Sequence, residues 1–168
     1  ELTQVSYISR YAMPVYSPRS FIGSGYQGTL GWGYATGLGV KVARPNVPVL
    51  SINGDGGFMY NVQEMSTAVR HGINLVAVVF NDGAFGNVQR IQKLRYGNRT
   101  IASDLTNPNF TKLAESFGVV GLRATSPQAL QDRLEEAFKM EAPVLIEAPI
   151  GEMPDPWSSV LKFSKVRG

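Results

Sequence analysis

Short apolar runs alternate along this chain with segments of helical periodicity, and this alternation restricts the fold more than any other feature. The runs at Pro48–Asn53, Leu75–Phe80, Val119–Arg123 and Pro143–Ala148 have the length and β-branched content of buried strands, and Phe21–Ile22 is a candidate for a first strand. Strands that alternate with helices form parallel sheets covered by those helices. The sequence therefore predicts an α/β fold, a parallel β-sheet flanked by helices on both faces.

Polar residues and glycines mark the ends of the predicted helices. Asn61 is a candidate N-cap, with Glu64 completing a capping box, for a helix that Gly72 ends. Asn107 and Ser126 are each followed by proline and predict the starts of two further helices. Apolar residues at helical spacing follow each start, so these stripes are predicted to face the core.

Composition excludes several kinds of site. The 168 residues suit one domain, and the net charge of +3 (16 Lys and Arg minus 13 Asp and Glu) is too small to indicate nucleic-acid binding. The absence of cysteine excludes thiolate nucleophiles and zinc–thiolate centres, and the one histidine, His71, is interpreted as structural because it lies at a helix end. Without a bilayer-length apolar stretch or a signal peptide before Glu1, a cytoplasmic protein with no membrane partner is expected.

The loops after the predicted strands are rich in glycine, asparagine and aspartate. Open parallel sheets bind ligands at the carboxyl ends of their strands, so these loops are the candidate site. The first loop contains Gly23-Ser-Gly-Tyr-Gln-Gly28, which matches the Gly-x-Gly-x-x-Gly fingerprint of dinucleotide-binding domains. That fingerprint requires an acidic residue about 20 positions further on, whereas the next acidic residue here is Asp55. A Rossmann-type nucleotide-binding module remains as an alternative.

Asp55 and Asp82 follow two consecutive predicted strands. Gly54, Gly56 and Gly57 around Asp55 let the backbone approach a ligand closely, although an ordinary turn would explain Asp-Gly alone. Adjacent parallel strands place their end loops side by side, so the two carboxylates can share a Mg²⁺ that bridges to a diphosphate. Oxygen ligands without histidine or cysteine favour Mg²⁺ over zinc.

Gly-Asp-Gly at 54–56 and Asn-Asp at 81–82 resemble the cofactor motif of the thiamine-diphosphate enzymes that include acetolactate synthase, pyruvate decarboxylase and benzoylformate decarboxylase. The resemblance implies a thiamine-diphosphate-binding fold in which Asp55, Asp82 and the backbone carbonyl of Ala84 hold the metal. The family more often has Asn at the position of Asp82, and Asn81 is the other candidate ligand.

A second segment, Gly28-Thr-Leu-Gly-Trp-Gly33, resembles the family's Gly-Thr-Met-Gly-Phe-Gly. The resemblance implies that the Gly28 carbonyl accepts from the cofactor's pyrimidine amino group and that Leu30 supports the bent cofactor; a core position for Leu30 is the alternative. Gln4 corresponds to a residue that contacts the diphosphate. The implied cofactor-binding set is Gln4, Gly28, Thr29, Leu30, Gly54, Asp55, Gly56, Gly57, Asp82, Ala84, Phe85 and Gly86.

In this family the residues that follow the second metal-binding loop, at Asp82 to Ala84 here, line the substrate pocket. The resemblance therefore implies Asn87, Val88 and Ile91 as pocket residues. Acetolactate synthases typically have Met and Trp at the positions of Asn87 and Ile91. A basic cluster follows, which is either a solvated helix face or a contact for an anionic substrate or another domain. It consists of Arg90, Lys93, Arg95 and Arg99.

The resemblance implies that different domains carry different parts of the active site. Residues 1–150 would be the thiamine-diphosphate and Mg²⁺ domain and residues 151–168 a C-terminal extension, while the pyrimidine-binding and middle domains lie outside this chain. The activating glutamate would come from the pyrimidine-binding domain of a neighbouring subunit, in a homodimer or homotetramer, so no catalytic residue is expected within the chain. FAD, where the full enzyme has it, would bind the middle domain.

The reaction that the resemblance implies is acetolactate synthase-like decarboxylation and carboligation of a small 2-oxo acid. The isolated chain is expected to be inactive. One alternative is a thiamine-diphosphate-dependent decarboxylase or C–C lyase that acts on an aromatic 2-oxo acid, a diketone or an acyl-CoA. Another is a non-catalytic domain that binds the cofactor for assembly only.

Overall fold

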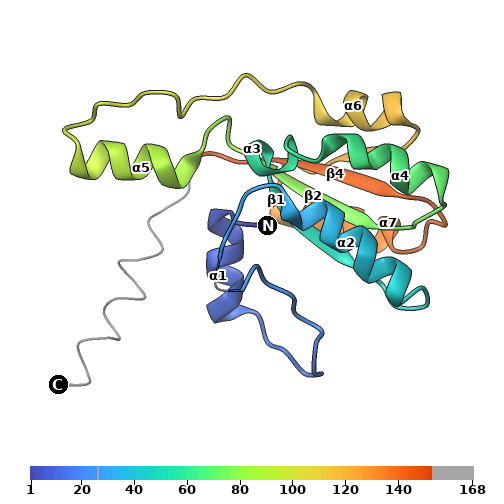
Figure 1. Ribbon diagram of the computed structural model, residues 1–168. Coiled ribbons are helices and arrows are strands. Elements are labelled where there is room, and N and C mark those ends of the chain that lie inside the picture. The colour runs from blue at the N-terminus through green and yellow to red at the C-terminus, as the bar shows by residue number, and fades with distance from the viewer. Residues whose placement is uncertain (26, 153–168) are drawn as a thin grey trace.

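The computed structural model describes residues 1–25 and 27–152, which form an α/β fold around a four-stranded parallel sheet (Figure 1). The strands are β1 (Leu50–Gly54), β2 (Val76–Asn81), β3 (Val120–Arg123) and β4 (Val144–Pro149). Their order in the sheet is β1-β2-β4-β3, and every pairing is parallel. The four strands agree with the prediction to within two residues at each end.

One predicted strand is wrong, because residues 21–22 belong to an irregular loop that follows a turn closed by the bond from Ser20 N to Ser17 O. Most of the predicted C-terminal extension lies outside the described residues. The helical elements are α1 (Gln4–Ala12), α2 (Trp32–Ala43), α3 (Asp55–Phe58), the 3-10 turn η1 (Val62–Glu64), α4 (Met65–Arg70), α5 (Gly86–Arg95), α6 (Phe110–Phe117) and α7 (Pro127–Ala137).

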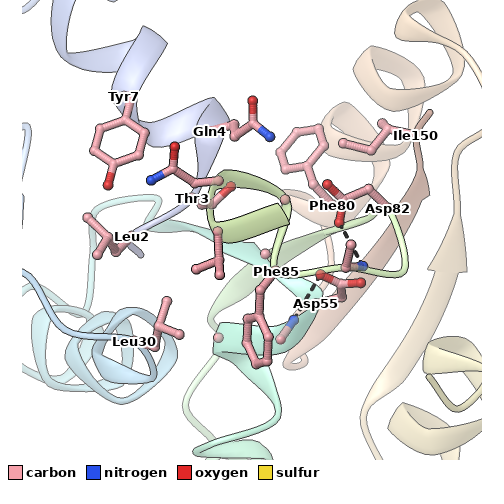
Figure 2. A pocket seen from close by; sticks show the side chains of 17 residues that line it. Leu2, Thr3, Gln4, Tyr7, Leu30, Asp55, Phe80, Asp82, Phe85 and Ile150 are labelled. Atoms are coloured by element: carbon pink, nitrogen blue, oxygen red, sulfur yellow. Dashed lines mark hydrogen bonds between the residues drawn. The ribbon is translucent and has the colours of Figure 1, made fainter. Parts of the chain in front are cut away.

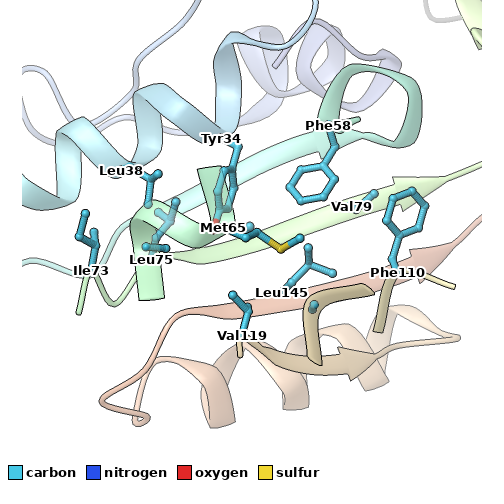
Figure 3. Close-up of a cluster of buried hydrophobic side chains, with 13 residues drawn as sticks. Tyr34, Leu38, Phe58, Met65, Ile73, Leu75, Val79, Phe110, Val119 and Leu145 are labelled. Atoms are coloured by element: carbon cyan, nitrogen blue, oxygen red, sulfur yellow. The ribbon is translucent and has the colours of Figure 1, made fainter. Parts of the chain in front are cut away.

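Successive strand residues face two separate apolar layers, as a pleated strand requires. One layer packs β2 and β4 against α2, α3, α4 and α6, and Figure 3 shows its largest side chains, Tyr34, Phe58, Met65, Phe110 and Leu145. The other layer packs the opposite face of β2 and β4 against α7. Helices therefore cover both faces of the sheet, which confirms the predicted architecture. No helix in the described part of the chain is long and apolar enough to cross a membrane.

The predicted capping box at the start of α4 is wrong. The Asn61 side chain makes no cap bond and instead donates to the carbonyl of Gly31, while Glu64 accepts from the Thr67 hydroxyl at 2.7 Å. The chain enters α4 through the 3-10 turn η1. Asn61 therefore ties the segment after α3 to the loop before α2.

The predicted cap is wrong for α6 and correct for α7. Asn109, and not Asn107, caps α6, because its side chain accepts from Lys112 N at 3.0 Å. Ser126 caps α7 as predicted and accepts from Ala129 N at 3.1 Å. The side chain of Asn107 is engaged elsewhere, at the carboxyl ends of the strands.

The segment after β2 is held by the chain that returns from α5. Phe85 N donates to Ser103 O at 2.8 Å and Leu105 N donates to Gly83 O at 2.8 Å, on either side of a bridge between Ala84 and Asp104. Figure 1 shows α5 and the chain after it extending away from the sheet. The loop at residues 82–85 is therefore fixed although the helix that follows it leaves the core.

Candidate functional site

One pocket lies where the carboxyl ends of β1, β2 and β4 meet the start of α1 (Figure 2). Parallel sheets place their ligands at this edge. Most residues that the sequence singled out line it together. These are Gln4, Leu30, Gly54, Asp55, Gly56, Gly57, Asp82, Ala84, Phe85, Gly86, Asn87 and Val88.

Three of the predicted residues do not line this pocket. Gly28 lies beside it, since a Cβ on Gly28 would be 3.3 Å from Leu2 Cδ1, and Thr29 is exposed. Ile91 is partly buried on α5, one turn beyond Asn87. Leu30 is 38% exposed in the pocket wall, so the alternative of a core leucine is wrong.

Asp55 is held rigidly at the end of β1. The residue is 2% exposed, and Oδ1 accepts from Gly56 N at 2.8 Å. Oδ2 accepts from Gly83 N at 2.9 Å and from Asn107 Nδ2 at 2.5 Å. Three donors on three different segments therefore orient a buried carboxylate, and Oδ1, which accepts one of these bonds, retains acceptor capacity.

Asp82, at the end of β2, shares this environment. Burial, and then the negative charge of Asp55 and a hydrogen bond with it, raise the pKa of Asp82 to about 6, against the opposing effect of backbone donors such as Ala84 N. Two carboxylates that repel one another at one site would both be stabilised in their charged form by a cation. The donor set of carboxylate and carbonyl oxygens suits Mg²⁺.

Asn81 does not line the pocket, so Asp82 is the better placed of the two candidate ligands. Its Nδ2 donates to Glu147 Oε1 at 2.9 Å and its Oδ1 accepts from Asn107 Nδ2 at 2.9 Å. Glu147 is in turn paired with Arg123 at 3.3 Å. A chain of polar contacts therefore runs from β3 through β4 and β2 to Asp55.

Side chains lie very close to the backbone of two pocket glycines, Gly56 and Gly86. A Cβ on Gly56 would lie 2.5 Å from Phe85 Cε1, and one on Gly86 would lie 2.7 Å from both Asp82 Oδ2 and Gln4 Nε2. The buried Oε1 of Gln4 has no hydrogen-bond partner among the described residues. A buried polar atom of this kind is satisfied when a ligand or an ion binds beside it.

Several pocket residues were missed by the sequence reasoning: Leu2, Thr3, Tyr7, Phe80 and Ile150. Phe80 and Ile150 lie at the carboxyl ends of β2 and β4, so the rule for strand ends could have identified them. The contact of Asn107 with Asp55 was also missed, because an asparagine before a proline, here Pro108, is typical of a helix cap.

Asp82→Asn is expected to remove a pH dependence of the cofactor-free protein. The pKa of Asp82 rises from 3.8 to about 6 on folding, so between these values the folded state retains a proton that the unfolded state has released. The stability of the wild-type protein should therefore fall as the pH rises from about 4 to 6, and this part of the fall should be missing in Asp82→Asn. Thermal unfolding of both proteins in metal-free buffer from pH 4 to 8 checks this, and parallel curves would contradict it.

Comparison with known proteins agrees with this geometry. The family described as "Thiamine pyrophosphate enzyme, C-terminal TPP binding domain" matches residues 2–148. The chain is 40% identical over 135 residues to the probable acetolactate synthase large subunit of Methanococcus aeolicus, over 80% of this chain and 22% of that protein. It is 38% identical over 144 residues to the acetolactate synthase of Bacillus subtilis (strain 168), over 86% of this chain and 25% of that protein.

A solved structure supports the same assignment. The thiamine diphosphate-dependent 4-hydroxybenzoylformate decarboxylase of Rhodococcus jostii RHA1 matches with a TM-score of 0.70 and 26% identity, over 75% of this chain and 24% of that one. The chain thus spans about a quarter of the length of these relatives. The Rossmann alternative is wrong, since residues 1–22, all of which the structure describes, contain no strand before Gly23, and the family match covers residues 2–148. The chain belongs to the thiamine-diphosphate enzyme family, as a C-terminal cofactor-binding domain like that of the acetolactate synthases.

Proposed function

We propose that this domain binds thiamine diphosphate through a Mg²⁺ held by Asp55, Asp82 and the backbone carbonyl of Ala84. The observation that carries the proposal is the pair of carboxylates from neighbouring parallel strands in one pocket, with the pKa of Asp82 raised to about 6 by burial and by Asp55. Gly83 N and Asn107 hold one oxygen of Asp55, and Gly56 N holds the other. The chain therefore orients a metal ligand before any metal arrives.

The remaining pocket residues would serve the cofactor itself. Gln4 offers an unpaired buried oxygen and a side-chain amide, and the glycines at 54, 56 and 57 leave the backbone open to a diphosphate. Leu30 would lie under the bent cofactor, with Gly28 and Thr29 beside its pyrimidine. Bound thiamine diphosphate supplies the carbanion chemistry that cleavage next to a 2-oxo acid carbonyl requires.

The proposed reaction of the complete enzyme is acetolactate synthase-like: decarboxylation of a 2-oxo acid, followed by transfer of the resulting group to an acceptor. The identity to acetolactate synthases over most of the chain supports it. Asn87 and Val88, at the start of α5 and in the pocket wall, would contact the substrate, with Ile91 one turn further on.

A second candidate is a decarboxylase or C–C lyase for a bulkier substrate, such as an aromatic 2-oxo acid. Asn87 and Ile91 stand where acetolactate synthases typically have Met and Trp, and Ile91 takes up less space than Trp. The resemblance in fold to a 4-hydroxybenzoylformate decarboxylase agrees with this alternative.

We also propose that a pyrimidine-binding domain of a neighbouring subunit completes the site, within a homodimer or homotetramer. The pocket on this chain has a volume of about 170 Å³, which is smaller than the usual 300–1,000 Å³ of a ligand site. No residue of α5 is buried, and Val88, Leu94 and Ile101, on α5 and in the chain after it, expose apolar side chains; of these, Val88 lines the pocket. A partner domain that packs against this helix would cover these apolar side chains and enclose the pocket.

Leu30→Ala is expected to separate cofactor binding from cofactor activation in the complete enzyme. Leu30 lines the pocket away from Asp55 and Asp82, so the affinity for the diphosphate should remain within about twofold, while hydrogen–deuterium exchange at the thiazolium carbon slows on the order of 10²-fold because the ring is misplaced. Leu30→Met keeps the bulk and serves as the control. Unchanged exchange in Leu30→Ala would contradict the role of Leu30.

The reaction is tested by supplying the complete enzyme with thiamine diphosphate, Mg²⁺ and a panel of 2-oxo acids, and by following carbon dioxide release and the products by NMR. Pyruvate converted to a branched 2-hydroxy-3-oxo acid would support the acetolactate synthase-like reaction. Aldehyde from an aromatic 2-oxo acid without carboligation would support the second candidate. A cofactor-loaded enzyme that releases no carbon dioxide from any of them would overturn both the acetolactate synthase-like reaction and the decarboxylase.

A further inference from the structure

A buried carboxylate that the cofactor motifs do not include lies behind the pocket. Glu1 is 8% exposed, and its side chain crosses to the start of α2. Oε1 accepts from Leu2 N and Gly31 N, both at 3.0 Å, and Oε2 accepts from Gly33 N at 2.9 Å. Gly31 is the N-cap of α2 and has no side chain to offer, so Glu1 supplies from a distance the acceptors that the first N–H groups of this helix lack.

The same side chain also contacts the short helix α3, which begins at Asp55. A Cβ on Gly33 would be 2.8 Å from Glu1 Cβ, and a Cβ on Gly57 would be 3.0 Å from Glu1 Cδ. Glu1 is thus enclosed between two glycines, one in the first turn of α2 and one in α3, two residues after Asp55. Neither segment could approach the carboxylate this closely with a side chain in place.

The segments that Glu1 joins are three walls of the pocket. Leu30 precedes Gly31, Asp55 and Gly56 precede Gly57, and Leu2, Thr3 and Gln4 follow Glu1 itself. Glu1 does not line this pocket among the described residues, and its two oxygens are directed to backbone amides. Its influence on a bound cofactor would therefore be exerted through the loops that it holds.

We infer that Glu1 is a positioning residue of the cofactor site, which fixes the Leu30 wall relative to the Asp55 loop by holding the amides of Gly31 and Gly33. The inference rests on the proposed function of the pocket. Both carboxylate oxygens accept, so an amide at this position would turn an NH₂ group towards one of the two glycine amides. Glu1→Gln keeps the shape of the side chain and breaks one side of this contact.

The test compares Glu1→Gln with Ser126→Ala in the complete enzyme. Both changes remove an acceptor at a helix N-terminus, but Ser126 caps α7 on the far face of the sheet from α2 and α4. Thermal unfolding without cofactor, calorimetric titration with thiamine diphosphate and Mg²⁺, and hydrogen–deuterium exchange at the thiazolium carbon are measured for each. Both variants should unfold at a lower temperature than wild type.

Only Glu1→Gln is expected to weaken cofactor binding, by about 10-fold to 100-fold as for other groups that orient metal and cofactor ligands, and to slow the exchange. Unchanged affinity and exchange in a folded Glu1→Gln variant would overturn the inference and leave a purely structural cap. Absence of binding by the wild-type enzyme would instead overturn the proposed function. If Glu1→Gln does not fold, Glu1→Asp withdraws the carboxylate by one methylene group, and unchanged cofactor affinity in that variant would overturn the inference as well.

Discussion

Asp55→Ala is expected to abolish Mg²⁺-dependent binding of thiamine diphosphate, with a loss of affinity of more than about 100-fold, because removal of a group that only orients a metal ligand already costs about 10-fold to 100-fold. The change deletes one of two carboxylates, leaves Gly56 N and Gly83 N without their side-chain acceptor, and leaves Asn107 Nδ2 with Asn81 Oδ1 as its remaining acceptor. Alanine at this position leaves Asp82 as the one carboxylate among the described residues that line the pocket. Calorimetric titration with thiamine diphosphate at saturating Mg²⁺ measures the effect.

The control separates loss of a ligand from loss of the fold. Each buried donor left unpaired costs about 1–3 kcal/mol, so Asp55→Ala should also lower the unfolding temperature of the cofactor-free protein. Asp55→Asn retains the shape and an acceptor and should fold better, yet still bind the cofactor weakly. Asp132→Ala, on the exposed side of α7, removes a carboxylate outside the pocket and should leave binding intact. Wild-type affinity in a folded Asp55→Ala would show that the metal site is elsewhere.

The purified 168-residue chain is expected not to turn over any 2-oxo acid, even with thiamine diphosphate and Mg²⁺ present. Activation of the cofactor would start from a glutamate that the proposed partner domain supplies. Positioned acid–base groups contribute about 10²–10⁴-fold to a rate, so the chain alone should release carbon dioxide at least about 100-fold more slowly than the complete enzyme. The pocket would also be open to water on the side of that partner domain.

Among the described residues, the candidate acids are poorly placed to replace this glutamate. Both oxygens of Glu1 accept from backbone amides, and Glu64 accepts from the Thr67 hydroxyl and does not line the pocket. Asp55 and Asp82 would be occupied as ligands of the metal. Robust turnover by the isolated chain would contradict this account, and Glu64→Gln would then be the first variant to assay.

The sequence predicted the parts of the structure that depend on local patterns. The four strands, both covered faces and the cap at Ser126 follow from periodicity and from residue types at helix ends, and the structure has them. The pairing of Asp55 with Asp82 followed from one topological rule, that adjacent parallel strands place their end loops together. These rules need no knowledge of which distant segments touch.

Two wrong helix caps and the overlooked role of Glu1 share a physical cause, which is that a polar side chain can bind a partner that is distant in the sequence. Asn61 and Asn107 both precede helical segments and have the chemistry of caps, but Asn61 donates to Gly31 and Asn107 donates to Asp55 and Asn81. Glu1 acts on glycines 30 and more positions away. Such partners are set by tertiary packing, so no local pattern near these residues indicates them.

The central claim is that this pocket binds thiamine diphosphate through a metal bridge. Its most direct test is a calorimetric titration of the complete enzyme with thiamine diphosphate, first with Mg²⁺ and then with a chelator in excess. The account predicts saturable binding with Mg²⁺ and at least about 100-fold weaker binding with the chelator, because the diphosphate would then face Asp55 and Asp82 without a cation between them. Equal binding under both conditions would contradict the account.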